Sequence, residues 1–308
     1  NVGISLHRVR KRDVIWGAIV IAITFLGITL ILGALLADNL QAGFLGSWRV
    51  RVLATHLHIA LLGWVLMMIA GISHRLLPMF LLAHTADTRW TRQALTLIPI
   101  GVILLACGIV SGNDTLGNAL PWVGLVLIEA GIACFIVQAV LFFRARKRPR
   151  LDAGLRHAAT ALVFLALASV LGPVVLAEGV HATRLDIVYV LLGLVGGLSL
   201  FVVGQFYKVV PFLAWMARFR EDMGRKSVPT VAQLYSQPIA NSDLVLLTTG
   251  VTAMTAGIAI GTTLVVTAGA LCFALGIALF VSQIMRVAFG TSRGAVRPAP
   301  ILSATGAG

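Results

Sequence analysis

The chain has 308 residues, of which 59% are hydrophobic and 11% charged, and its mean hydropathy is +0.98. So few polar residues would not cover a water-soluble globule, so the composition excludes a soluble domain and predicts an integral membrane protein. A formal net charge of +13 is also typical of nucleic-acid-binding proteins, but the positions of the charges favour membrane topology, and we expect no nucleic-acid partner.

A helix that crosses the hydrocarbon core of a bilayer needs about 18 or more apolar residues. Eight stretches meet this requirement, so we predict an all-α polytopic bundle that forms one transmembrane domain over 1–308. Because the chain begins with Asn and no signal-type apolar run precedes the first stretch, we expect a missing start, with room for further upstream segments. The eight stretches lie at 14–37, 52–80, 94–112, 120–143, 157–178, 186–214, 243–262 and 264–286.

The basic residues are unevenly distributed between the two ends of these spans. If the N-terminus is inside, 21 of the 24 Lys and Arg fall on the same side as that terminus. The positive-inside rule therefore predicts a bacterial-type cytoplasmic (inner) membrane with both termini cytoplasmic. The run RARKRPR at 144–150 is either an RNA-binding surface or a loop that contacts anionic membrane lipid, and we favour lipid.

The end of the second span is repeated at the end of the sixth. GISHRLLPMF, at 71–80, and GQFYKVVPFL, at 204–213, share a glycine, a basic residue and a proline at matching positions. Four spans separate the copies, so we predict two parallel four-helix repeats, at approximately 14–143 and 157–286, related by an axis along the membrane normal. A cytoplasmic connection of approximately 216–242 links the sixth and seventh spans.

Two interpretations of this inner-face motif remain open. In the first, the basic residue extends to the interface and the proline turns the chain. In the second, the two copies share a contact with a quinone or an anion. The residues concerned are His74 and Arg75 in the first copy, and Tyr207 and Lys208 in the second.

Ionisable side chains inside the spans carry most of the functional information, because a charge at mid-membrane costs roughly 2.5 to 3.5 kcal/mol. His56, His58 and Glu129 lie at similar depth toward the outer side, and His181 follows in an outer connection. We therefore expect a cluster near the outer face. His56 and His58 are about 200° apart on a helix, so they do not grip one metal from the same face.

Each of these groups also has a simpler interpretation. A histidine in a span also forms hydrogen bonds to a neighbouring helix without binding a ligand. Glu129 is a proton-path group, a partner for a protonated histidine, or a hydrogen-bonded structural acid. We expect His74, His84 and His157 to be solvated histidines at the inner interface.

The stretch HLHIALLGW at 56–64, followed by LLPMF at 76–80, resembles membrane haem proteins related to subunit I of haem-copper oxidases. The similar branches are the catalytic subunits of cytochrome c oxidase and nitric oxide reductase, and the NnrS-type proteins. The resemblance implies that His56 or His58 is an axial ligand of haem b, with His181, the other histidine of the pair or a methionine as the second donor. Copper bound by the same histidines is an alternative. Without an adjacent His-His pair or a second His-x-His, we expect a shortened or degenerate relative that lacks a complete oxygen-reducing centre.

Three function classes follow. The first is electron transfer by a haem b protein, as an oxidoreductase component that accepts electrons from a quinol or periplasmic donor, with Glu129 in the proton path. The second is a transporter or accessory subunit whose His and Glu bind a proton, a metal ion or a small anion. The third is a structural subunit of a larger respiratory or oxygenase complex. The chain has neither GxxxxGK[ST] nor GxSxG, and the lack of these motifs argues against nucleotide hydrolysis and serine-hydrolase chemistry.

Overall fold

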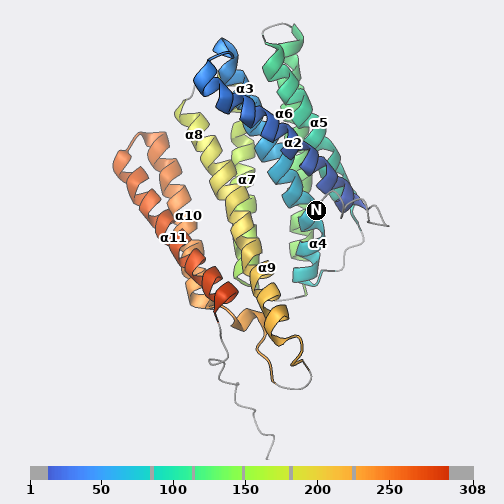
Figure 1. The fold of residues 1–308 in the computed structure, drawn as a ribbon, viewed down its shortest axis with the longest axis vertical. Helices are drawn as coiled ribbons and strands as arrows, with labels where there is room; N and C mark the ends of the chain where they lie inside the picture. The colour runs from blue at the N-terminus through green and yellow to red at the C-terminus, as the bar shows by residue number, and fades with distance from the viewer. Residues whose placement is uncertain are drawn as a thin grey trace, which may run out of the picture. The chain divides into compact units, whose positions relative to one another are not determined.

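The computed structural model describes residues 13–83, 87–112, 115–147, 150–179, 183–223 and 227–290. The described residues are 88% helical and contain no strand. Within this described part of the chain, eight helical spans are long and apolar enough to cross a membrane. The prediction of an all-α polytopic bundle is confirmed, and the chain is a multi-pass membrane protein (Figure 1).

Six of the eight spans are single helices, and the second and sixth are composite. The single helices are α2 (Val14–Ala42), α5 (Arg89–Ser111), α6 (Thr115–Arg144), α7 (Ala153–Glu178), α10 (Gln237–Ile260) and α11 (Thr263–Phe289). The second span runs through η1 (Gly46–Trp48), α3 (Arg49–His58), η2 (Ile59–Leu66) and α4 (Met67–Leu81). The sixth runs through α8 (Arg184–Val190), η3 (Leu191–Ser199) and α9 (Leu200–Phe219), and the short turn η4 (Val231–Gln233) precedes α10.

Several helix ends lie away from the predicted boundaries because capping extends the helices beyond the apolar core. Asp13 begins α2 by accepting a hydrogen bond from the Trp16 backbone nitrogen at 2.9 Å, and the left-handed Gly43 ends it. The connection predicted at 216–242 is shorter, because α9 continues to Phe219 and α10 begins at Gln237. Some residues that the sequence pattern placed at or beyond the edges of the spans therefore lie inside helices.

The second and sixth spans share an internal irregularity. Each contains a π-helical segment, and η2 and η3 both end twelve residues before the proline of the repeat, at Leu66 before Pro78 and at Ser199 before Pro211. π-helical segments are rare inside α-helices, and those that occur are often found at functional sites. The match between the two copies thus includes a backbone feature as well as residue types.

Close contacts between helices also recur in the two halves of the chain. A methyl group at Gly101 of α5 would lie 2.6 Å from the carbonyl oxygen of Gly124 of α6, and one at Gly250 of α10 would lie 2.9 Å from that of Gly269 of α11. Both helix pairs therefore pack backbone to backbone, as small residues allow in membrane bundles. Figure 1 shows α5 beside α6 and α10 beside α11.

By packing, the chain divides into two units. Unit 1 comprises Asn1–Arg150 and Leu162–Leu198, and unit 2 comprises Leu151–Ala161 and Ser199–Gly308. The boundaries differ from those of the predicted repeats, because most of α7 and the first part of the sixth span pack with unit 1.

We expect Gly124→Ala to destabilise the protein by about 1–3 kcal/mol, the usual cost of forcing extra atoms into a packed core. The added methyl group would lie 2.5 Å from the backbone nitrogen of Leu105, which has little freedom to move. Thermal unfolding in detergent measures the change. Gly27→Ala is the matched control, because no atom lies within 4 Å of its added methyl group, and it should leave the melting temperature unchanged or raise it. Equal melting temperatures for the two variants would contradict this packing.

Candidate functional site

The two histidines of the resemblance motif have separate surroundings in unit 1. The His56 ring lies against α2, where a methyl group at Gly33 would be 3.2 Å from its Cε1 atom. His56 Nδ1 is buried and has no hydrogen-bond partner among the described residues. His58 Nδ1 donates to the carbonyl oxygen of Ala54 at 2.8 Å, which leaves Nε2 as its second nitrogen. The helix starts at Gly46, so His56 lies ten residues along it, or about 15 Å from its beginning.

Glu129 packs on α7 in the same unit. Its Oε1 atom would lie 2.9 Å from a methyl group at Gly172, so the carboxylate lies directly over the backbone of that helix. Within the described part of the chain, no three His, Cys, Asp or Glu side chains are grouped as metal ligands would be. His181 lies outside the described residues.

The two copies of the inner-face motif differ in environment. His74 is half-buried, and its Nδ1 atom forms a 2.8 Å hydrogen bond with Thr91 Oγ1. Arg75 is exposed, whereas Lys208 forms an ion pair with Asp152. Tyr207, the counterpart of His74, is only 1% exposed. The second copy is therefore the more enclosed of the two.

The most deeply buried titratable groups lie in unit 2, where α7, α9 and α10 meet. His157 of α7 and Asp243 of α10 both have 0% side-chain exposure, and His157 Nε2 lies 3.2 Å from Asp243 Oδ1. This is ion-pair distance without the alignment of a hydrogen bond. The hydroxyl of Tyr207, on α9, donates to the other oxygen of the same carboxylate. We call these three residues the buried triad.

The expectation that His157 is a solvated histidine at the inner interface is wrong, and the cause is a close approach of two helix backbones. A methyl group at Gly154 of α7 would lie 2.5 Å from the carbonyl oxygen of Gly204 of α9. The reciprocal methyl group at Gly204 would lie 3.0 Å from the Cβ atom of His157. Because two glycines let the helix backbones approach closely at this crossing, the imidazole is buried between them.

The backbone fixes how this imidazole presents itself to the carboxylate. A carbonyl oxygen only accepts hydrogen bonds, so His157 Nδ1 must donate to Ala153 O, which lies 2.8 Å away. A neutral imidazole in that tautomer turns a lone pair at Nε2 toward Asp243. Repulsion between the lone pair and the carboxylate is relieved only when one of the two groups holds an additional proton. The geometry therefore brings an imidazole nitrogen and a carboxylate oxygen, which together can share one proton, to within 3.2 Å of each other.

Aromatic rings and polar bonds surround the triad. The ring of Tyr207 lies 5.4 Å from that of His157 and 5.2 Å from that of Tyr235, centroid to centroid. Burial raises the pKa of Tyr235, which precedes α10, above the ordinary value of a phenol. Gln283 of α11 fastens the start of α10 by bonding both the nitrogen and the oxygen of the Ser236 backbone at 2.9 Å. This shell keeps the triad apart from bulk water.

Sequence reasoning missed Asp243 because of an error in a helix boundary. The predicted span began at residue 243, so the aspartate was not considered among the ionisable residues inside the spans. The helix in fact begins at Gln237, so Asp243 lies more than one turn inside it. The available signal was the match of Tyr207 to His74, which already marked this level of the bundle.

Neither protein-family models nor curated proteins give a match to this chain. The resemblance to haem-copper oxidase subunit I therefore stays a prediction.

We expect removal of one member of the buried pair to be strongly destabilising. Asp243→Ala leaves an uncompensated buried imidazole, and His157→Ala leaves an uncompensated carboxylate, each at a cost of about 3–5 kcal/mol. The double variant removes both polar groups and should be clearly less destabilised than the sum of the single variants. Unfolding of the four proteins in detergent gives the coupling free energy. Additive effects would mean that the two side chains do not interact.

Proposed function

We propose that this protein is a proton-coupled membrane transporter in which the buried triad takes up and releases the proton. The observation that carries the proposal is the His157–Asp243 pair, which has no exposed side-chain surface and lies within two membrane-spanning helices. Ionisable residues inside membrane spans are costly, and proton relays in pumps and transporters are a principal use of them.

The chemistry of the triad supports reversible protonation. With one proton between Nε2 and Oδ1, the pair is neutral overall, which suits a low-dielectric site. Loss of that proton leaves one negative charge, which the hydroxyl of Tyr207 stabilises by donating to Oδ2. The two states thus differ by a full charge while sharing the same hydrogen-bonded frame.

The architecture supports transport as the class. π-helical segments occur in both composite spans, and η3 directly precedes the helix that bears Tyr207. Internal repeats and irregular helices are common in secondary transporters. We propose the bacterial-type cytoplasmic membrane as the location, with both termini cytoplasmic, since 21 of 24 basic residues would then face the cytoplasm.

Infrared spectroscopy of the purified protein tests the proton site without knowledge of the transported substrate. A pH titration of the wild-type protein should show a change in carboxyl or imidazole bands, and both Asp243→Asn and His157→Gln should remove it. Glu178→Gln is the control, because it neutralises an exposed carboxylate and should leave these bands in place. A wild-type signal that persists in Asp243→Asn but disappears in Glu129→Gln would move the proton site to α6 and overturn the proposal.

Transport itself is tested in proteoliposomes. A potassium diffusion potential should drive proton uptake through the wild-type protein, either alone or on addition of a transported substrate, and Asp243→Asn should reduce it to the level of empty vesicles. Glu178→Gln should retain the wild-type rate. Equal proton uptake by Asp243→Asn and the wild-type protein would contradict a role for the triad.

A second candidate function is electron transfer by haem b, and one observation favours it. Histidines that bind metals usually donate their other ring nitrogen to a carbonyl or carboxylate group, and His58 Nδ1 donates to Ala54 O. The residues thus fit one axial donor, His58 through Nε2, whereas the second donor is unassigned among the described residues. A haem bound there would supply one-electron redox chemistry. The proposed electron donor is a quinol or a periplasmic protein, and the proposed binding partners are other subunits of a membrane complex. Copper held by His56 or His58 is the weaker form of this candidate.

We expect His58→Ala to abolish a b-type signal in the reduced-minus-oxidised spectrum if this second function is correct. The haem content of the purified protein, measured as the pyridine haemochrome, should be stoichiometric in the wild type and in His74→Ala. Haem bound equally by His58→Ala and the wild type would eliminate His58 as the ligand. A colourless wild-type protein would eliminate the second candidate and leave the proton site untouched.

A further inference from the structure

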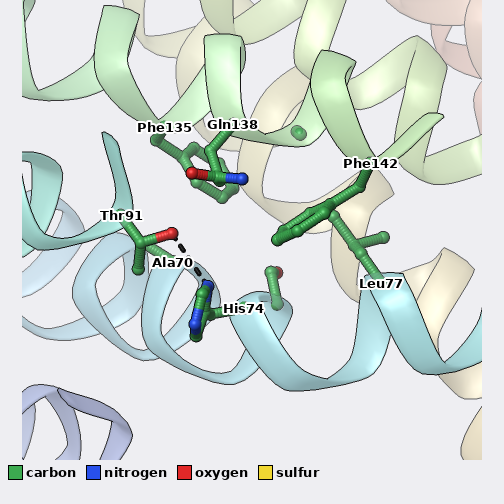
Figure 2. A pocket seen from close by; sticks show the side chains of 9 residues that line it. Ala70, His74, Leu77, Thr91, Phe135, Gln138 and Phe142 are labelled. Carbon is green, nitrogen blue, oxygen red and sulfur yellow. Dashed lines mark hydrogen bonds between the residues drawn. The ribbon is translucent and has the colours of Figure 1, made fainter. Parts of the chain in front are cut away.

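A small cavity lies between α4, α5 and α6 of unit 1, at the level of His74. Its volume is about 10 Å³, which is close to the minimum for one water molecule, about 10–15 Å³. Figure 2 shows the side chain of Gln138 projecting from α6 into the space between that helix and α4. The lining is mostly apolar and includes Ser73, His74, Leu77, Thr91 and Gln138.

Gln138 is the unusual member of this lining. Its side chain is 3% exposed, and neither Oε1 nor Nε2 has a hydrogen-bond partner among the described residues. A buried amide without partners loses the hydrogen bonds that it would make in water, so such groups are rare in native proteins unless an ordered water satisfies them.

The corresponding position in unit 2 shows what a satisfied glutamine looks like. Gln138 lies seven residues after Gly131, which packs on α5, and Gln283 lies seven residues after Gly276, which packs on α10. Gln283 bonds the nitrogen and the oxygen of the Ser236 backbone. Gln138 has the same place in its helix pair, but no such backbone segment among the described residues bonds it.

We infer that the cavity binds one ordered water molecule, held by the amide of Gln138. The amide offers both an acceptor and a donor, and the hydroxyls of Ser73 and Thr91, which are 3% and 5% exposed, line the same space. These groups meet the requirement of two to four polar partners for a buried water. The volume excludes a larger ligand. This inference does not rest on the proposed function, since it concerns another unit and other residues.

The water would add a hydrogen-bonding partner beside His74 and Thr91. His74 is already bonded to Thr91 at Nδ1, and both residues border the cavity. A water bound there extends a chain of hydrogen-bonding groups from α4 and α5 to α6 through an otherwise apolar interior. In unit 1 a bound water would thus satisfy the glutamine amide, whereas in unit 2 the backbone of Ser236 satisfies it directly.

Radiolytic hydroxyl labelling with mass spectrometry tests this on the full chain in detergent. Radicals formed from a bound water modify the side chains beside it, even where bulk solvent does not reach. Leu77, which lines the cavity and is 1% exposed, should be modified several-fold more than Leu247, which lies in the core of unit 2 and is 0% exposed. Gln138→Met preserves the side-chain volume, removes the amide and should lower modification of Leu77 to the level of Leu247.

Two results would overturn the inference. Equal modification of Leu77 and Leu247 in the wild-type protein would mean that the cavity is dry, and this comparison needs no variant. Undiminished modification of Leu77 in a folded Gln138→Met protein would mean that the amide does not hold the water. Gel filtration and a thermal melt confirm folding of the variant, whereas Gln283→Met, which leaves the Ser236 backbone without its partner, should lower the melting temperature more than Gln138→Met does.

Discussion

A histidine and an aspartate with no exposed side-chain surface are the constraint on which the rest of unit 2 depends. Two such groups inside an apolar bundle are tolerated only when each neutralises the other and the remaining lone pairs and protons find partners. Ala153 accepts from the imidazole, and Tyr207 donates to the carboxylate. The pair is therefore bound from three helices, and any rearrangement of those helices must pass through a change in its protonation or its hydrogen bonds.

Close backbone contacts make this burial possible. In lipid there is no hydrophobic force between helices comparable to that in water, so association depends on packing and on small residues. Gly154 and Gly204 bring α7 and α9 together beside His157, and Gly250 and Gly269 bring α10 and α11 together. The glycines contribute no chemistry themselves, but they set the depth at which the ionisable side chains lie.

The two halves of the chain have similar glycine contacts between helices but different polar side chains beside them. Counting from the paired glycines Gly101 and Gly250, the place of Asp243 in α10 is that of Ala94 in α5, and both are fully enclosed. Where the second half has an aspartate and a tyrosine, the first has an alanine and a half-buried histidine, with a small cavity beside Gln138. A common scaffold thus carries a buried histidine–aspartate pair in one half and a smaller polar site in the other.

The sequence by itself determined the class of fold, because eight apolar stretches of sufficient length dictate helices that cross a membrane, and the match of Pro78 to Pro211 revealed the repeat. It also singled out Tyr207, His58 and Glu129 as residues of interest. It did not determine the partners of any of them. Asp243 was missed because apolar patterns do not register the polar first turns of a helix. His157 was assigned to solvent because glycine crossings between distant segments leave no periodic signal. Only the tertiary structure decided that these two side chains meet, since burial of a charge depends on which backbones approach each other closely.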